Sequence, residues 1–217
     1  MRTPIGRTLG RDGEDLSGDR SDRALTTTLR PAAIGLLLSS AAGIALLHVV
    51  RADLNPVHHR LSEYANGAYG SVMTASFFAL GAGMVVLGLA MRQTALSGRW
   101  SHLVRLALVV AGFGMVLSGL YPTDPGGAPT TNERVHSLAS GAASVALIGA
   151  VALAALVPWS RVPRRATGAG GLLAFIVLIL GVASPILHDT DWTGLSQRLL
   201  WAALMAWLLV NAWKLAR

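Results

Sequence analysis

The sequence contains no cysteine among its 217 residues, which excludes a disulfide framework and any chemistry that needs a thiolate. Charged residues are also scarce, at 13% of the chain, while 53% of the residues are hydrophobic and the mean hydropathy is +0.52. A soluble domain with so little charge could not cover its surface, so the expected solvent is lipid. No charged residue lies at the middle of any apolar run, which argues against an ion channel or a proton-coupled pump.

Six uncharged apolar runs are long enough, or nearly so, for the roughly 20 residues that cross a bilayer as a helix. We therefore expect an all-α polytopic membrane protein, with a bundle of six transmembrane helices in a domain spanning residues 31–217. Re-entrant or interfacial segments are the alternative for the two shortest runs, the third and the sixth. The first run is expected to be a retained helix rather than a cleaved signal peptide. The runs are Ala32–Val50, Ser71–Met91, Leu106–Tyr121, Ser137–Trp159, Ala166–Leu187 and Leu199–Trp213.

The distribution of arginine and lysine predicts the orientation. Fourteen of the eighteen lie in residues 1–30, 92–105, 158–166 and the C-terminal tail, and four lie in residues 51–70, 121–136 and 186–198. The positive-inside rule therefore places both termini in the cytoplasm, with the chain in the plasma membrane. The mixed-charge, glycine-rich and aromatic-free residues 1–30 are expected to be a disordered cytoplasmic tail. The net charge of +7 then reflects arginines at the inner membrane surface rather than affinity for nucleic acid.

The six acidic residues after residue 30 all lie in the predicted outer segments. In the first of these segments, His59 and Glu63 are spaced i, i+4, so they share one face if residues 58–64 are helical. Such a pair can donate two ligands to a metal ion, or it can form a plain hydrogen bond. No HxxxH, HExxH or paired Cys/His spacing is present, so we assign no metal site.

The second and third outer segments add further polar side chains. Thr130 and Glu133 form a capping box, so a helix should begin near residue 131 and carry His136 one turn inside. A turn rich in proline and glycine holds Asp124 at the same depth. Imidazoles and carboxylates gathered at one end of a bundle indicate a common site, although histidine and tyrosine also favour membrane interfaces for structural reasons. The third segment contributes His188, Asp189, Asp191, Gln197 and Arg198.

Three stretches of the sequence carry a resemblance to a known family: "SEYANGAYGSVMTASFFALG", "GLYPTDPGG…TTNERVHSLAS" and "TGLSQRLLWAALMAW". They resemble the signatures of the bacterial and archaeal membrane family called domain of unknown function 998, over about residues 32–213. The matching positions are Ser62-Glu63-Tyr64, Tyr121-Pro122-Thr123-Asp124, His136 and the Gly-x-x-Gln-Arg motif of Gly194–Arg198. The family more often has Phe at the position of Tyr121. The resemblance implies an integral membrane protein of six or seven helices and leaves its activity undefined.

Two classes of function fit the outer cluster. The first is binding or handling of a membrane lipid, isoprenoid or similar amphiphile, with Arg60, Arg134 and Arg198 meeting a phosphate or other anionic headgroup. The competing interpretation is that each arginine only pairs with an aspartate of its own segment, Asp53, Asp124 or Asp191. The candidate ligand-binding residues are His58, His59, Glu63, Tyr64, Arg134, His188, Asp191, Gln197 and Arg198.

The second class is an intramembrane hydrolase or lipid-modifying enzyme. Ser62 or a bound water would be the nucleophile, His136 or His59 the base, and Asp124 would orient the imidazole. Proximity separates the two classes, because catalysis requires Ser62, Asp124 and His136 to converge around an enclosed cavity. A purely structural or partner-chaperoning role is the third alternative. The sequence identifies neither a cofactor nor an oligomeric state.

Overall fold

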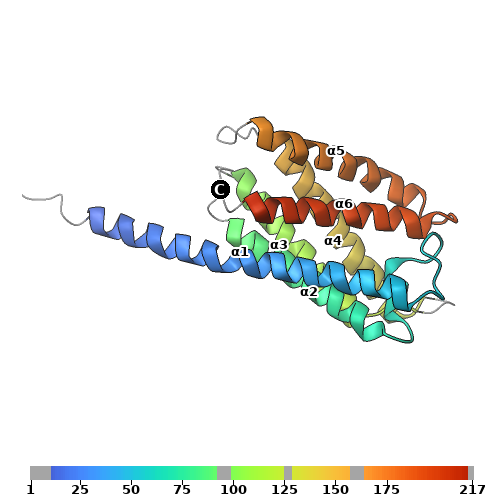
Figure 1. Cartoon of the computed structure of the whole chain (residues 1–217). Coiled ribbons are helices and arrows are strands. Elements are labelled where there is room, and N and C mark those ends of the chain that lie inside the picture. The colour runs from blue at the N-terminus through green and yellow to red at the C-terminus, as the bar shows by residue number, and fades with distance from the viewer. Residues whose placement is uncertain (1–10, 92–98, 125–128, 157–163, 215–217) are drawn as a thin grey trace, which may run out of the picture.

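The computed structural model describes residues 11–91, 99–124, 129–156 and 164–214. These ranges contain six α-helices, one short 3₁₀ helix and no strand, which confirms the all-α fold expected from the apolar runs (Figure 1). The elements are α1 (Arg11–Val50), η1 (Leu61–Ala65), α2 (Gly70–Ala90), α3 (Arg99–Leu120), α4 (Thr131–Leu156), α5 (Arg164–Ile186) and α6 (Thr193–Lys214).

Five of the described helices are long and apolar enough to cross a membrane, and α5 adds the shorter apolar stretch Gly170–Ile186. The helices α3, α4 and α6 begin six or seven residues before the uncharged runs that predicted them. The reason is that a helix can continue through polar first turns into the interfacial region, where long basic side chains reach water. The chain is therefore a multi-pass helical membrane protein, as predicted.

The outward faces of the helices agree with this assignment. Phe113, Val145 and Val182 are 60%, 73% and 67% exposed, and other large apolar side chains are exposed along the same helices. An apolar surface of this extent is unfavourable in water but matches the acyl chains of a bilayer.

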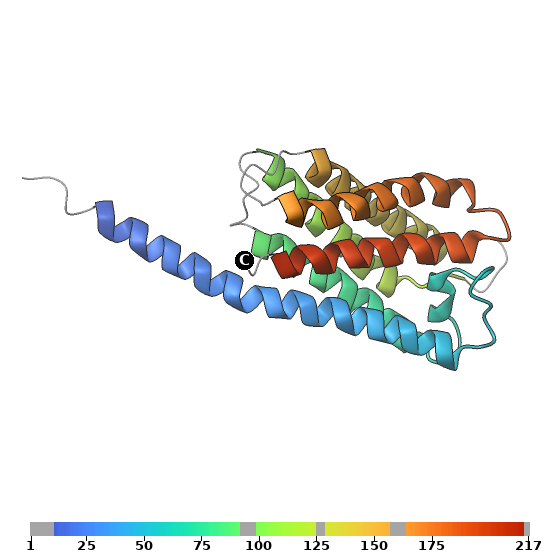
Figure 2. The same cartoon turned by 45° about the horizontal axis from the view of Figure 1, so that its top comes forward.

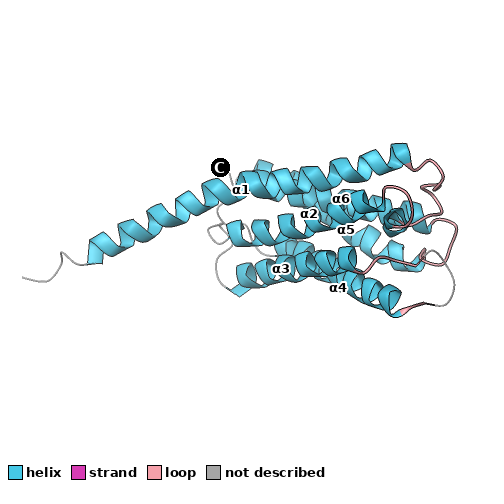
Figure 3. Ribbon diagram, turned by 90° about the horizontal axis from the view of Figure 1, so that it is seen from below, coloured by secondary structure: helices cyan, strands magenta, loops and turns pink. Residues whose placement is uncertain are grey.

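The segments that join α1 to α2, α3 to α4 and α5 to α6 all lie at one end of the bundle (Figures 1 and 3). We call this end the loop end; its described residues are 51–69, 121–124, 129–130 and 187–192. The C-terminus lies at the opposite end (Figure 1). The three segments predicted to share one side of the membrane are therefore neighbours.

The N-terminal part of α1 runs beyond the bundle on the side away from the loop end (Figure 2). Residues 11–30, which the sequence assigned to a disordered tail, form the first part of this helix, while residues 1–10 lie outside the described ranges. That the first thirty residues form a separate cytoplasmic tail stays a prediction.

Glycines bring α2, α3 and α4 into close contact. A Cβ atom at Gly81 would lie 2.5 Å from the carbonyl oxygen of Gly112, and a Cβ at Gly112 would lie 2.5 Å from that of Gly81, so the two helix backbones touch. Gly114 packs in the same way against Ala139 and Ala143 of α4. Close approach of this kind lets dispersion hold helices together where no hydrophobic effect acts between them. Helices α5 and α6 pack less closely on α4 and α1, and a cavity remains between them.

Candidate functional site

The first loop is anchored by Arg51, which directly follows α1 and is 8% exposed. Its Nε and Nη2 each donate to the Asp53 carboxylate at 2.9 Å, and its Nη1 donates to the carbonyls of Asn66 and Ala68 at 2.7 and 3.0 Å. The hydrogen bonds from Arg51 hold the pKa of Asp53 below its usual range, and the carboxylate raises the pKa of Arg51. The pairing of Asp53 with Arg60 considered from the sequence is therefore wrong, because the nearer Arg51 takes the carboxylate.

The short helix η1 is fixed by Glu63. One carboxylate oxygen accepts the backbone N–H of Arg60 at 2.9 Å, and the other lies 2.7 Å from Nδ1 of His59. The i, i+4 pair of His59 and Glu63 is therefore a hydrogen bond, one of the two alternatives left open by the sequence. The helical stretch is Leu61–Ala65, a 3₁₀ turn that begins later than the expected residue 58.

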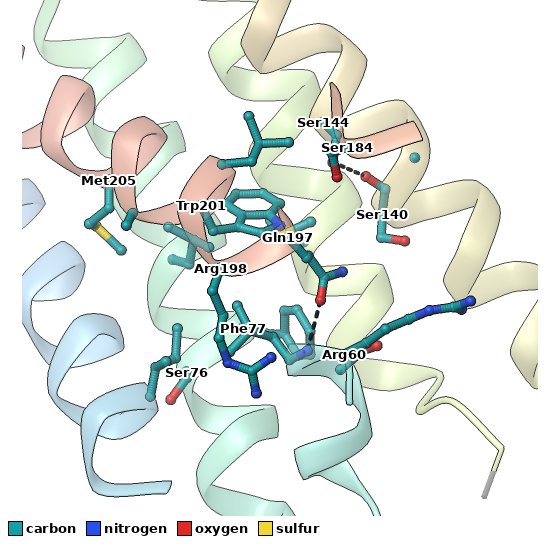
Figure 4. A pocket seen from close by; sticks show the side chains of 18 of the residues that line it. Arg60, Ser76, Phe77, Ser140, Ser144, Ser184, Gln197, Arg198, Trp201 and Met205 are labelled. Carbon is teal, nitrogen blue, oxygen red and sulfur yellow. Dashed lines mark hydrogen bonds between the residues drawn. The ribbon is translucent and has the colours of Figure 1, made fainter. Parts of the chain in front are cut away.

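The start of α6 packs directly on the first loop. A Cβ at Gly194 would lie 2.3 to 2.8 Å from the carbonyl oxygens of Pro56, Val57 and His59, so only glycine fits there without a shift of the backbone. The N–H of Leu195 donates to the Val57 carbonyl at 3.1 Å. Oε1 of Gln197 accepts the N–H of Leu61 at 2.7 Å (Figure 4). The Gly-x-x-Gln-Arg motif therefore joins α6 to a loop more than 130 residues away in the sequence.

Arg198 completes this connection. Its Nη1 donates to the carbonyls of Pro56, His59 and Gly194, and its Nε donates to Nε2 of His48 at 2.8 Å. Because Nδ1 of His48 lies 2.8 Å from the Ile44 carbonyl, that nitrogen carries the proton and the ring is neutral.

The guanidinium of Arg198 also lies over the ring of a buried tyrosine. Its central carbon is 5.3 Å from the Tyr64 ring centroid, and His48 packs against the same ring edge-on at 5.2 Å. Nη2 of Arg198 and the Tyr64 hydroxyl are both buried and have no hydrogen-bond partner among the residues that the structure describes. Among the described residues, no carboxylate lies within salt-bridge distance of Arg198.

The second loop is held by hydrogen bonds among Asp124, Thr130 and Glu133. The Asp124 carboxylate accepts the N–H of Thr130 at 3.0 Å, and the Glu133 carboxylate accepts the N–H of Asp124 at 2.8 Å. The Thr130 hydroxyl accepts the N–H of Glu133 at 3.4 Å, and α4 begins at Thr131, as the capping box predicted. Asp124 therefore holds the turn, and no hydrogen bond among the described residues joins it to His136.

His136 is 4% exposed and is oriented by the backbone. Its Nδ1 lies 2.9 Å from the carbonyls of both Ser118 and Tyr121, and its ring packs edge-on against Phe77 at 5.8 Å. Since both partners of Nδ1 are acceptors, this nitrogen carries a proton, and in the neutral tautomer that this implies Nε2 would be an acceptor. Backbone carbonyls thus supply the orientation that the sequence assigned to Asp124.

Further contacts join the three loops. Nδ1 of His58 lies 2.7 Å from the Asp191 carbonyl oxygen, and the Thr123 hydroxyl donates to the Ser62 carbonyl at 3.3 Å. In the third loop, Nδ1 of His188 lies 2.8 Å from the Asp189 carboxylate. Within the described part of the chain, no three His, Cys, Asp or Glu side chains are grouped so that they could hold a metal ion.

A cavity of about 1080 Å³ lies between α1, α2, α4, α5 and α6. Along α6 its lining runs from Thr193 to Leu209, a length of about 24 Å at the helical rise of 1.5 Å per residue. At the loop end the lining is polar: Arg60, Glu133, His136, His188, Asp189, Gln197 and Arg198. Farther from the loops it includes Ile44, Leu80, Met115, Ile148, Trp201, Met205 and Leu209.

Serine hydroxyls accompany the apolar residues of the cavity wall. Ser140 and Ser144 of α4 and Ser184 of α5 lie across the cavity from Trp201 and Met205 of α6 (Figure 4). The Ser144 hydroxyl donates to the Ser140 carbonyl at 2.8 Å, so its oxygen lone pairs remain available to a second donor.

The structure brings some of the sequence-predicted residues to one place and leaves others outside it. Ser62 and His136 both line the cavity, while Asp124 does not. Arg134 is exposed and is not part of the lining. Five other candidates also lie outside the lining. Tyr64 lies beneath Arg198. The other four take part in the loop contacts described above: His58, His59, Glu63 and Asp191.

Sequence reasoning missed the loop anchor Arg51 and most of the deep cavity wall. One signal could have found part of that wall, because Ser137, Ser140 and Ser144 are spaced i, i+3 and i+7 on one face of α4. Ser184 and Trp201 carry no such signal, since their places depend on how α5 and α6 pack.

Comparison with known proteins identifies a family. The model of a family described as "Protein of unknown function (DUF998)" matches residues 33–214. No curated protein and no solved structure matches the chain.

Proposed function

The chain belongs to the DUF998 family, whose activity is undefined, and we propose from its cavity that it binds a membrane amphiphile such as a lipid or isoprenoid. The polar end of the ligand would lie among the loop-end residues of the cavity, and its hydrocarbon chain would lie along α6. The single observation that carries this proposal is the change along the lining from charged and amide groups near Gln197 to apolar groups near Leu209.

The size of the cavity supports the same ligand class. Small-molecule sites usually occupy about 300–1,000 Å³. A cavity of about 1080 Å³ that follows α6 over several turns suits an elongated molecule better than a compact one. Since the helices around it are apolar enough to span a bilayer, the most abundant elongated molecules nearby are the lipids themselves.

The test uses a substitution that fills the cavity. Gly141 of α4 lines the cavity, and a Cβ added there has no atom within 4 Å. Gly149 lies on the same helix, is equally open, and is outside the lining, so it is a matched control. We expect native mass spectrometry of the detergent-purified protein to find a retained lipid in the wild type and in Gly149→Phe, and at least a several-fold loss in Gly141→Phe. Equal retention in the two variants would refute the proposal.

The second candidate function is hydrolysis of the bound amphiphile, and the geometry of His136 favours it. This buried imidazole lines the cavity with Nδ1 held by two carbonyls, so Nε2 of its neutral form would serve as the base. Incubation of the protein with membrane lipid extract, followed by mass spectrometry of the products, tests this function. Turnover that disappears in His136→Gln would support it, and the absence of any product would count against it.

We also infer the orientation from the positive-inside rule: the loop end faces away from the cytoplasm, both termini are cytoplasmic, and the membrane is the plasma membrane. The ligand would then have its polar end in the outer leaflet.

A further inference from the structure

Two arginines at the loop end, the buried Arg51 and the half-buried Arg198, differ in how their charge is balanced. Arg51 donates to the Asp53 carboxylate and to two carbonyls, and none of its side-chain nitrogens is buried without a partner. Within the described ranges, Arg198 donates only to groups without a negative charge, namely His48 and three carbonyls, and its Nη2 is buried without a partner there. The Tyr64 ring offers a π face to this guanidinium but carries no counter-charge.

A second cation lies at the same end of the cavity. Arg60 lines the cavity, and in the described part of the chain its side chain has neither a salt bridge nor a hydrogen bond to a carboxylate. Gln197 lies between Arg60 and Arg198 in the view of Figure 4 and has its amide oxygen bound to Leu61, which leaves its NH₂ group as a further donor.

The carboxylates that line the cavity are occupied by other groups. Glu133 accepts the N–H of Asp124 and the Ser137 hydroxyl, at 2.8 and 3.2 Å. Asp189 lies 2.8 Å from the ring nitrogen of His188. The two guanidinium groups are therefore not paired within the described chain, in a cavity surrounded by low-dielectric helices, where an unpaired charge is costly.

We propose that the loop end of the cavity binds the oxyanion of a phosphate-bearing amphiphile between Arg60 and Arg198. This inference rests on the proposed function and specifies its ligand class. A phosphate would supply the missing counter-charge, and its oxygens match the fork of a guanidinium. The Gln197 amide would donate to the same headgroup.

The test compares two lipids with identical chains, phosphatidic acid and diacylglycerol, each brominated on the acyl chains and diluted in detergent micelles that hold the full-length protein. Bromine quenches tryptophan fluorescence on contact, and Trp201 lines the cavity. The quenching measured in the wild type minus that measured in Trp201→Phe is the quenching of Trp201, which reports on lipid in the cavity. We expect phosphatidic acid to bind about 10- to 100-fold more tightly than diacylglycerol, the range for a charge-assisted hydrogen bond.

Arg60→Gln should abolish this preference and should still fold, because the Arg60 side chain makes no hydrogen bond or ion pair within the described residues. Size-exclusion chromatography and circular dichroism check the fold. Arg134→Gln is the matched control, since Arg134 is an exposed arginine at the same end and outside the lining. An equal loss of preference in Arg134→Gln would overturn the proposal, because it would indicate a general effect of surface charge.

The remaining outcomes distinguish failure of the phosphate subsite from failure of amphiphile binding itself. Equal quenching by both lipids would overturn the phosphate subsite and leave amphiphile binding intact. No Trp201-dependent quenching by either lipid would overturn both. Competition by millimolar inorganic phosphate would support a subsite that also accepts the free anion, and a phosphatidic acid preference without such competition would support one specific for the lipid headgroup.

Discussion

At the scale of single residues, the family-like motifs at the loop end mainly hold the loops together. The sequence drew attention to Glu63, Asp124, Gln197 and Arg198, and each makes a specific hydrogen bond in the structure. The partners of the Glu63 and Asp124 carboxylates lie within six positions of them, but that of Gln197 and most of those of Arg198 could not be predicted, because they lie more than 130 positions away. The carbonyls of residues 56 and 59 that bind Arg198 are about 140 positions from it, and no periodicity encodes such a contact.

Replacing Arg198 by Ala tests this structural role. The change removes the hydrogen bonds to His48 and to the Pro56 and His59 carbonyls, so we expect the free energy of unfolding to fall by at least about 2 kcal/mol. Thermal unfolding in detergent, followed by circular dichroism, measures the loss. Arg134→Ala, at an exposed position, should stay within about 0.5 kcal/mol of the wild type. Equal stability of the two variants would show that Arg198 is not a structural anchor.

At the scale of elements, the six helices follow directly from the apolar runs, since any lipid-embedded backbone must satisfy its own hydrogen bonds. The start of α4 was also predictable, because the capping box at Thr130 and Glu133 is a local signal. The contact between α6 and the first loop was not, although Gly194 within its motif marks the place where the two backbones meet.

Gly194→Ala should weaken this contact. The added Cβ would lie 2.3 Å from the His59 carbonyl oxygen, so the loop or the helix must shift, at a cost of about 1–3 kcal/mol. Gly149→Ala is the control, because a Cβ there meets no atom within 4 Å, and it should be neutral or slightly stabilising. Chemical denaturation in mild detergent compares the two, and an unchanged Gly194→Ala would contradict the packing described for α6.

At the scale of the whole molecule, the sequence predicted a multi-pass bundle with its polar chemistry at one end. The lipid-binding hypothesis included a pocket, but the sequence did not predict which helices line it, because the space between α4, α5 and α6 depends on packing distances that composition does not encode. The convergence of the three candidate catalytic residues could not be predicted from the sequence either. Ser62 and His136 reach one cavity, but Asp124 is committed to the neighbouring turn.

The orientation of the molecule can be tested with single cysteines, since the chain has none of its own. Thr130 is exposed at the loop end, and His102 is exposed near the start of α3 at the opposite end. We expect a membrane-impermeant maleimide to label Thr130→Cys on intact cells and to label His102→Cys only after the cells are opened. The reverse pattern would show that the loop end faces the cytoplasm.

The most direct test of the central claim is a cryo-electron microscopy map of the protein in lipid nanodiscs. If the cavity binds an amphiphile, the map should show a continuous elongated density inside it, with its head beside Gln197 and its tail beside Trp201 and Met205 of α6. A map in which helices α4, α5 and α6 close on one another and leave no space for a ligand would contradict that claim.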